Sequence, residues 1–268
     1  MTQRRFAAVA AILLMMAAAS FAHPTGDPAW NEFLTWYKTY TGSPYPNELI
    51  KAYTAQLAAS GKSQEEIRTV LEVLRKVSAN APTEMMRMHF NKVFTIHTDL
   101  FSHEPNALLV RTVRGLKPGR ALDIAMGQGR NSVFLAKQGW DVTGYDFSDE
   151  ALASACRGAD EAGVRIKTVQ STHEQFEFGN QQWDLIVMTY ALINMQDQAL
   201  LGRIKNSLKP GGLILVEQPN SGGEGKGPAN ALFRSFEDMR VIYYEDTVDV
   251  AEWSKKPNRL GRIVVQKD

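Results

Sequence analysis

Short apolar segments alternate with amphipathic helical segments from about Pro105 onward, and this alternation constrains the fold more than any other feature of the chain. Apolar runs bounded by turn residues are typical of strands that are buried on both faces of a sheet. Strands separated by helices pair in parallel, because each helix carries the chain back along one face of the sheet. The segments predicted as strands are residues 120–124, 141–145, 165–169, 184–188 and 213–217. The sequence therefore predicts an α/β domain with a doubly wound, mostly parallel sheet.

The C-terminal part of the sequence departs from this pattern. Residues 239–245 and 261–266 are predicted as two further strands, and the interval between them is too short for a crossover helix. Consecutive strands that lack a crossover pair antiparallel. We therefore expect an antiparallel edge strand on the otherwise parallel sheet.

The N-terminal part of the chain has helical periodicity and no strand pattern. Its clearest helix follows Ser63 and Glu66, which form a capping box ahead of an apolar face with three- and four-residue spacing. We predict a helical cap over residues 23–102, followed by the α/β domain over residues 103–268. The cap is expected to close over the ligand site as a lid.

The first 22 residues form a separate segment. Arg4 and Arg5 precede an apolar run over residues 6–19, which is too short to span a bilayer comfortably. Ser20 and Ala22 then supply the small residues of a cleavage site. This pattern predicts a signal peptide or an N-terminal anchor. The protein is expected to be exported, to the periplasm or as a secreted protein, or tethered to the membrane. A cytoplasmic location is the alternative.

Charge and composition narrow the class of partner. The chain has 30 basic and 29 acidic residues and a formal net charge of +1. Its overall charge therefore gives no electrostatic attraction for nucleic acid. We expect a small-molecule partner, no nucleic acid, and membrane contact only through an uncleaved leader. No metal site is predicted. The alternative is a copper ion held by His23 as a new N-terminus, which would need a second histidine. The sequence carries no signal for an oligomeric state.

A glycine-rich turn follows the first predicted strand. Asp123, Gly127 and Gly129 stand just before a predicted helix, where small residues let the backbone approach a ligand and the helix N-terminus presents its N–H groups. Asp146, at the end of the second strand, has a carboxylate that can accept hydrogen bonds from both hydroxyls of a ribose. Together these features indicate a nucleotide-like ligand.

Two other nucleotide-binding motifs, the dinucleotide fingerprint and the P-loop, fit this turn less well. The dinucleotide fingerprint needs a third glycine, and Ser132 stands at that position, so a nicotinamide cofactor is the weaker interpretation. The Gly-Lys-Ser/Thr end of a P-loop is missing, so the sequence gives no support for phosphoryl transfer.

Residues 122–129, Leu-Asp-Ile-Ala-Met-Gly-Gln-Gly, resemble motif I of the class I S-adenosylmethionine-dependent methyltransferases, with Ala125 in place of the first glycine. Residues 183–187 and 208–217 resemble the fourth and fifth strands of that family, in particular its tellurite-resistance-like branch. The resemblance covers about residues 90–268 and implies a Rossmann-like fold with S-adenosylmethionine as the cofactor.

The resemblance also implies roles for individual residues. Cofactor binding is implied for Asp123, Ala125, Gly127 and Gly129 around the methionine part, Asp146 on the ribose, Phe147 beside the adenine, and Thr172 and Thr189 after the third and fourth strands. The family often has an acidic residue where Thr172 stands, and a threonine hydroxyl can still accept one hydrogen bond. Tyr190 and Asn194, just beyond the fourth strand, are the candidate catalytic residues.

The function implied is methyl transfer from S-adenosylmethionine to a small-molecule acceptor that the sequence does not identify. One alternative is a binding protein that kept the fold and lost catalysis, which Ala125 and Thr172 favour. A nicotinamide-dependent reductase is a further alternative, and it would bind NADH.

Overall fold

The computed structural model describes residues 27–43, 46–80, 82–96, 101–220, 230–252 and 256–268. The predicted leader and His23 therefore lie outside the described residues. The chain divides into two compact units, Met1–Ile96 and His97–Asp268, so the second unit begins six residues before the predicted boundary at 103. In the part of the chain that the structure describes, no helix is long and apolar enough to cross a membrane.

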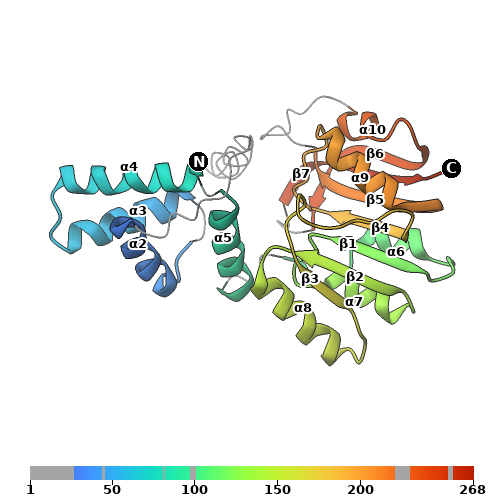
Figure 1. The fold of residues 1–268 in the computed structure, drawn as a ribbon, viewed down its shortest axis with the longest axis horizontal. Coiled ribbons are helices and arrows are strands. Elements are labelled where there is room, and N and C mark those ends of the chain that lie inside the picture. The colour runs from blue at the N-terminus through green and yellow to red at the C-terminus, as the bar shows by residue number, and fades with distance from the viewer. Residues whose placement is uncertain (1–26, 44–45, 81, 97–100, 221–229, 253–255) are drawn as a thin grey trace. The chain divides into compact units, whose positions relative to one another are not determined.

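The first unit is helical, as predicted (Figure 1). Its helices are α2 (Pro28–Thr39), α3 (Pro46–Ala59), α4 (Gln64–Asn80) and α5 (Pro82–Ile96). The capping box is confirmed, because the Ser63 backbone N–H donates to Glu66 Oε2 at 2.7 Å and the Glu66 N–H donates to Ser63 Oγ at 3.3 Å. Helices α2, α3 and α4 share one aromatic and aliphatic core, in which Phe33 and Tyr53 meet edge to face.

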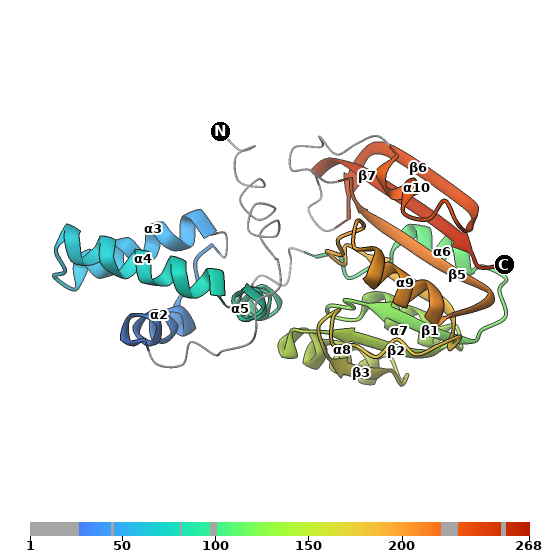
Figure 2. The same ribbon diagram turned by 45° about the horizontal axis from the view of Figure 1, so that its top comes forward.

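The second unit is a seven-stranded sheet with helices on both faces (Figures 1 and 2). The strands are β1 (Arg120–Ile124), β2 (Asp141–Asp146), β3 (Lys167–Gln170), β4 (Trp183–Thr189), β5 (Leu208–Pro219), β6 (Arg240–Ala251) and β7 (Lys256–Gln266). The helices are α6 (Ala107–Val113), α7 (Arg130–Lys137), α8 (Asp149–Glu161), α9 (Gln198–Ser207) and α10 (Ala231–Arg234).

The strand order is β3-β2-β1-β4-β5-β7-β6. The first five strands of this order are parallel, and β7 runs antiparallel to both β5 and β6. The prediction of a doubly wound, mostly parallel sheet with an antiparallel edge is therefore confirmed. The hairpin of β6 and β7 is longer than predicted, because pairing continues out to Ala251 and Lys256.

The sheet buries side chains on both faces because successive residues of a strand point to opposite sides. On β1, Leu122 and Ile124 join the core on one face, while Ala121 joins the core on the other. The order of strands reverses between β1 and β4, and in such sheets the ligand crevice lies at the carboxyl ends of the strands beside this point. A ligand site is therefore expected at the carboxyl ends of β1, β2, β4 and β5.

Candidate cofactor and acceptor site

The turn after β1 is built from residues with left-handed backbone. Ala125, Gly127 and Gly129 have φ values of 52°, 54° and 77°. The Met126 N–H donates to Tyr145 O on β2 at 3.0 Å, and the Gly129 N–H donates back to Met126 O at 2.9 Å. The chain is thereby folded tightly over the end of the sheet before α7 begins.

Ala125 is the one alanine in this turn with a backbone that favours glycine. A left-handed residue with a Cβ costs about 1 kcal/mol or more, and part of this is returned because glycine has the more flexible unfolded state. Ala125→Gly is therefore expected to raise the free energy of unfolding by about 0.5–1 kcal/mol. Denaturant titration measures this change. Gly127→Ala is the matched control with the opposite sign, and a destabilised Ala125→Gly protein would show that the left-handed backbone carries no strain.

Gly129 lies against α8. A Cβ added there would lie 2.7 Å from Ala155 Cβ and 3.2 Å from Ala155 Cα. Glycine at this position lets α8 approach the turn, in addition to allowing the left-handed backbone. A side chain here would thus meet the protein itself, which the sequence interpretation of a purely ligand-facing glycine did not include.

Asp123 is buried beneath the turn, with 1% of its surface exposed. Its Oδ2 accepts a hydrogen bond from Ser132 Oγ in α7 at 2.7 Å. Burial raises the pKa of its carboxyl to about 7. Asp123 therefore fixes the start of α7 to β1 through Ser132, whose backbone also hydrogen-bonds this carboxyl.

Asp146 joins the end of β2 to the turn after β1. Its Oδ2 accepts from the Gly127 N–H at 3.0 Å, and its Oδ1 accepts from the Ser148 N–H at 2.9 Å. The Phe147 backbone also hydrogen-bonds this carboxylate, which can accept about four hydrogen bonds in all and so keeps acceptor capacity. Burial raises the pKa of this carboxyl to about 6.

The raised pKa values of Asp123 and Asp146 predict a pH dependence of cofactor binding. The sequence resemblance implies that Asp146 holds the ribose of S-adenosylmethionine. A ribose hydroxyl donates best to the ionised carboxylate, so affinity for this cofactor is expected to fall as the pH is lowered from about 8 to about 5.5. Binding near pH 6 should release protons, which calorimetry in buffers of different ionisation enthalpy measures. Affinity that is constant over this range would contradict the prediction.

The stability of the ligand-free protein has the opposite dependence on these two groups. Because their folded pKa values of about 7 and about 6 lie above the ordinary value of 3.8, the folded state binds more protons than the unfolded state in this window. Their contribution to the free energy of unfolding therefore falls as the pH rises from about 4 to about 7.

Thr189 ends β4 and is connected to two helices. Its Oγ1 accepts from Asn131 Nδ2 at 2.8 Å, and Asn131 Oδ1 accepts from the Asn106 N–H at 2.9 Å. Asn131 lies in the first turn of α7, and Asn106 caps α6. Asn131 and Asn106 are both buried, and the sequence interpretation missed their role because each reads as an ordinary helix start.

The hydroxyl of Tyr190 is fully engaged. It donates to Glu217 Oε1 at 2.5 Å and accepts from the Glu252 N–H at 3.3 Å, while Glu217 Oε2 accepts from Arg262 Nε at 2.9 Å. Burial and the neighbouring Glu217 raise the pKa of Tyr190 above its ordinary value. Tyr190 thus stays protonated at neutral pH and can serve as a wall or an anchor but not as a general base.

The other predicted residues lie at the same edge of the sheet. Phe147 directly follows β2 and is half-buried, and Thr172 begins the turn after β3, where its hydroxyl accepts from the Gln175 N–H at 3.4 Å. Asn194, in the loop after β4, is exposed, and its Oδ1 accepts from the Gln196 N–H at 3.0 Å. These residues follow three different strands, and the hydrogen bonds of Thr172 and Asn194 given above stay within their own turns.

Glu252 is a further residue at this edge that the sequence did not single out. Its carboxylate accepts from Asn106 Nδ2 and from the Ala107 N–H, each at 3.0 Å, and it forms an ion pair with Arg130 at 2.8 Å. It thereby ties the end of β6 to the starts of α6 and α7. No local pattern indicates such a residue, because the partners of its carboxylate are more than a hundred positions away in the sequence.

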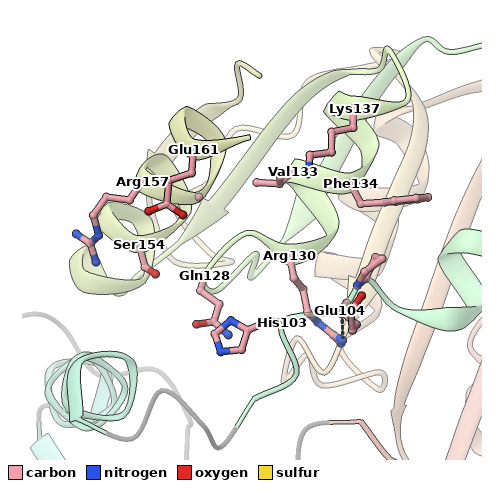
Figure 3. Close-up of a pocket in the computed structure, with 12 residues that line it drawn as sticks. His103, Glu104, Gln128, Arg130, Val133, Phe134, Lys137, Ser154, Arg157 and Glu161 are labelled. Carbon is pink, nitrogen blue, oxygen red and sulfur yellow. Dashed lines mark hydrogen bonds between the residues drawn. The ribbon is translucent and has the colours of Figure 1, made fainter. Parts of the chain in front are cut away.

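A groove of about 520 Å³ runs along α7 and α8 (Figure 3). Its walls are partly apolar and carry both signs of charge, with Arg130 and Lys137 from α7 and Arg157 and Glu161 from α8. Gln128, in the turn after β1, lines one part of it. The groove therefore borders the predicted cofactor turn but lies beside the helices rather than over the strand ends.

Comparison with known proteins agrees with this architecture. Residues 121–212 match the profile of a family described as methyltransferase domain. The ubiquinone biosynthesis O-methyltransferase of Azorhizobium caulinodans is 33% identical over 111 residues, which are 41% of this chain and 44% of that protein. The chain spans between 38% and 61% of the length of the curated relatives it matches.

Two solved structures share the fold. The crystal structure of TehB from Haemophilus influenzae has a TM-score of 0.53 and 19% identity, over 61% of this chain and 62% of that chain. The cyclase SpnF has a TM-score of 0.56 and 14% identity, over 69% of this chain and 96% of that chain. The strand order and the turn after β1 define a Rossmann-like domain. Residues 121–212 are thus similar to methyltransferase domains, and the relative named above is an O-methyltransferase.

Proposed function

We propose that this protein is an enzyme that transfers a methyl group from S-adenosylmethionine to a small-molecule acceptor. The observation that carries the proposal is the junction of Asp146 with Gly127. A buried carboxylate with free acceptor capacity stands beside a left-handed glycine turn, at the switch point of a doubly wound sheet. That combination suits a ribose joined to a charged amino-acid group.

The residues of the turn fit the cofactor. Gln128 Nε2 is buried and has no hydrogen-bond partner among the described residues, so it is a donor in need of an acceptor. In our proposal Asp146 would hold the ribose hydroxyls, and Gly127 and Gly129 would leave room for the methionine part. Phe147 and Thr172 would flank the adenine.

When bound, S-adenosylmethionine supplies a methyl group that its sulfonium already activates. The chain then has to place the acceptor in line with that group and exclude water. Thr189, Tyr190 and Asn194 follow β4 and are proposed to line the acceptor side. Because the Tyr190 hydroxyl is engaged with Glu217, we propose positioning rather than proton abstraction by this tyrosine.

A second candidate function is binding without catalysis. Ala125 is held in a left-handed conformation with φ of 52°, and Thr172 replaces an acidic residue that would hold the adenine. SpnF, named a cyclase, has the same fold, so the fold alone does not determine the reaction.

Calorimetric titration of the purified protein tests the proposal. Saturable binding of S-adenosylmethionine and S-adenosylhomocysteine, without binding of NADH, is the expected result. An acceptor screen with thiols and oxyanions of the heavier chalcogens then separates enzyme from binding protein. Binding of NADH alone would support a reductase, and binding of none of the three would refute the cofactor assignment.

We also propose that residues 1–22 direct the chain out of the cytoplasm or tether it to the membrane. A reporter that is active only outside the cytoplasm, fused to the C-terminus, distinguishes the two. An active reporter supports export, and an inactive reporter on a membrane-bound protein supports a tethered domain that faces the cytoplasm and its supply of cofactor. An inactive reporter on a protein found in the soluble cytoplasmic fraction would refute the proposal.

A further inference from the structure

His173 connects the ends of two strands that are not neighbours in the sequence. Its Nδ1 lies 2.8 Å from the hydroxyl of Tyr145 on β2, and its Nε2 lies 3.0 Å from the carbonyl oxygen of Ala191 in the loop after β4. The ring also meets the Tyr145 ring edge to face, with centroids 5.7 Å apart. The imidazole therefore bridges the side of the sheet that holds Asp146 and the side that holds Thr189.

The partners of His173 determine its protonation. A carbonyl oxygen can only accept, so Nε2 carries the proton and donates to Ala191, and Nδ1 accepts from the Tyr145 hydroxyl. Burial lowers the pKa of the ring, which favours the neutral form. The hydrogen bonds thus run in one direction, from Tyr145 through His173 to Ala191.

The loop that receives this hydrogen bond is strained. Ala191 stands between Tyr190 and Leu192, whose φ values are 56° and 55°. Left-handed residues other than glycine persist only where their surroundings enforce them, and they gather at functional sites. Tyr190 is enforced from one side, since its N–H donates to Glu217 O at 2.8 Å. His173 holds the next residue of the same loop through Ala191 O.

The segment that carries His173 is itself held firmly. The Arg203 guanidinium on α9 donates to Glu174 O at 3.1 Å and to Phe176 O at 2.6 Å. The Phe176 ring stacks on Tyr145 with centroids 4.2 Å apart. These contacts hold the turn after β3 in place. The position of the His173 ring therefore determines the position of Ala191.

We propose that His173 is a positioning residue for methyl transfer. It would set the loop after β4, and with it the acceptor side of the site, at a defined place relative to the cofactor. His173 would act through Ala191 and would not touch the methyl group. The inference rests on the proposed function and adds to it the residue that aligns its two halves.

The test compares three variants of the full chain. In His173→Gln the amide nitrogen replaces Nε2 and keeps the donor to Ala191, whereas in His173→Asn the shorter side chain cannot reach it. Tyr145→Phe removes the other hydrogen bond and keeps the stack on Phe176. The readouts are the dissociation constants of S-adenosylmethionine and S-adenosylhomocysteine, which differ by the methyl group, and amide hydrogen exchange over residues 189–196.

The expected result is selective. His173→Asn should speed exchange in the loop and weaken S-adenosylmethionine about tenfold, the effect of one net hydrogen bond, while S-adenosylhomocysteine changes by less than about threefold. His173→Gln should restore both readouts, and Tyr145→Phe should leave the ratio of the two constants unchanged. Equal loss of both ligands, unchanged exchange in His173→Asn, or identical behaviour of the Gln and Asn variants would overturn the positioning role.

The wild-type protein separates this inference from the function on which it rests. If wild type binds neither ligand, the proposed function fails and the positioning role falls with it. If wild type binds both ligands and the variants do not differ from it, the proposed function stands and only the role of His173 is refuted.

Discussion

Asp146→Ala is expected to weaken the binding of S-adenosylmethionine about a hundredfold or more. The substitution removes the acceptor of two charge-assisted hydrogen bonds, and it leaves the ribose hydroxyls unpaired in a buried place. It also releases the N–H groups of Gly127 and Ser148, which the carboxylate now holds at 3.0 and 2.9 Å. The turn after β1 therefore loses a support at the same time as the ligand loses a contact.

Calorimetric titration with S-adenosylmethionine measures the effect, with circular dichroism as a check of the fold. Asp149→Ala is the matched control, because Asp149 is an exposed carboxylate in the first turn of α8. Its removal should cost the helix less than about 1 kcal/mol and leave affinity unchanged. An Asp146→Ala protein with wild-type affinity would show that the cofactor site lies elsewhere.

Gly129→Val is expected to lower the free energy of unfolding by about 3 kcal/mol or more, because a left-handed backbone and overpacking each cost about 1–3 kcal/mol. The clash is with the protein, since an added Cβ would come within 2.7 Å of Ala155 Cβ. Loss of cofactor binding should follow from the displaced turn. Denaturant titration measures the change in stability, and a Gly129→Val protein as stable as wild type would refute the close packing of α8.

Two matched variants separate the causes. Gly158 lies one turn further along α8 and has no heavy atom within 4 Å of an added Cβ, so Gly158→Ala should raise stability by about 0.5–1 kcal/mol. The pair Gly129→Ala with Ala155→Gly removes the clash and keeps the unfavourable φ. It should therefore be more stable than Gly129→Ala alone.

Local pattern was sufficient to predict the strands and the turn. The predicted strand at 120–124 coincides with β1, and the short interval before residues 261–266 predicted the antiparallel β7. Both follow from chain geometry, since a strand needs a short apolar run and a crossover needs a helix. The glycines after β1 predicted the turn because glycine adopts a left-handed backbone without steric cost.

The side-chain network at the strand ends could not be predicted in this way. Glu217, Arg262 and Glu245 are direct register partners on three strands, and the pairing of β5, β7 and β6 brings them together. That network decides that the Tyr190 hydroxyl is engaged, whereas the sequence could only place Tyr190 after β4. Hydrogen bonds between residues far apart in the chain depend on the register, which short-range periodicity does not contain.

The place of β7 between β5 and β6 has a consequence for synthesis. During translation β6 leaves the ribosome before β7, yet β6 reaches the sheet only through β7. The edge of β5 therefore remains unpaired while β6 is synthesised. The sheet is completed only after β7 has been synthesised. Pairing between strands so distant in sequence slows folding.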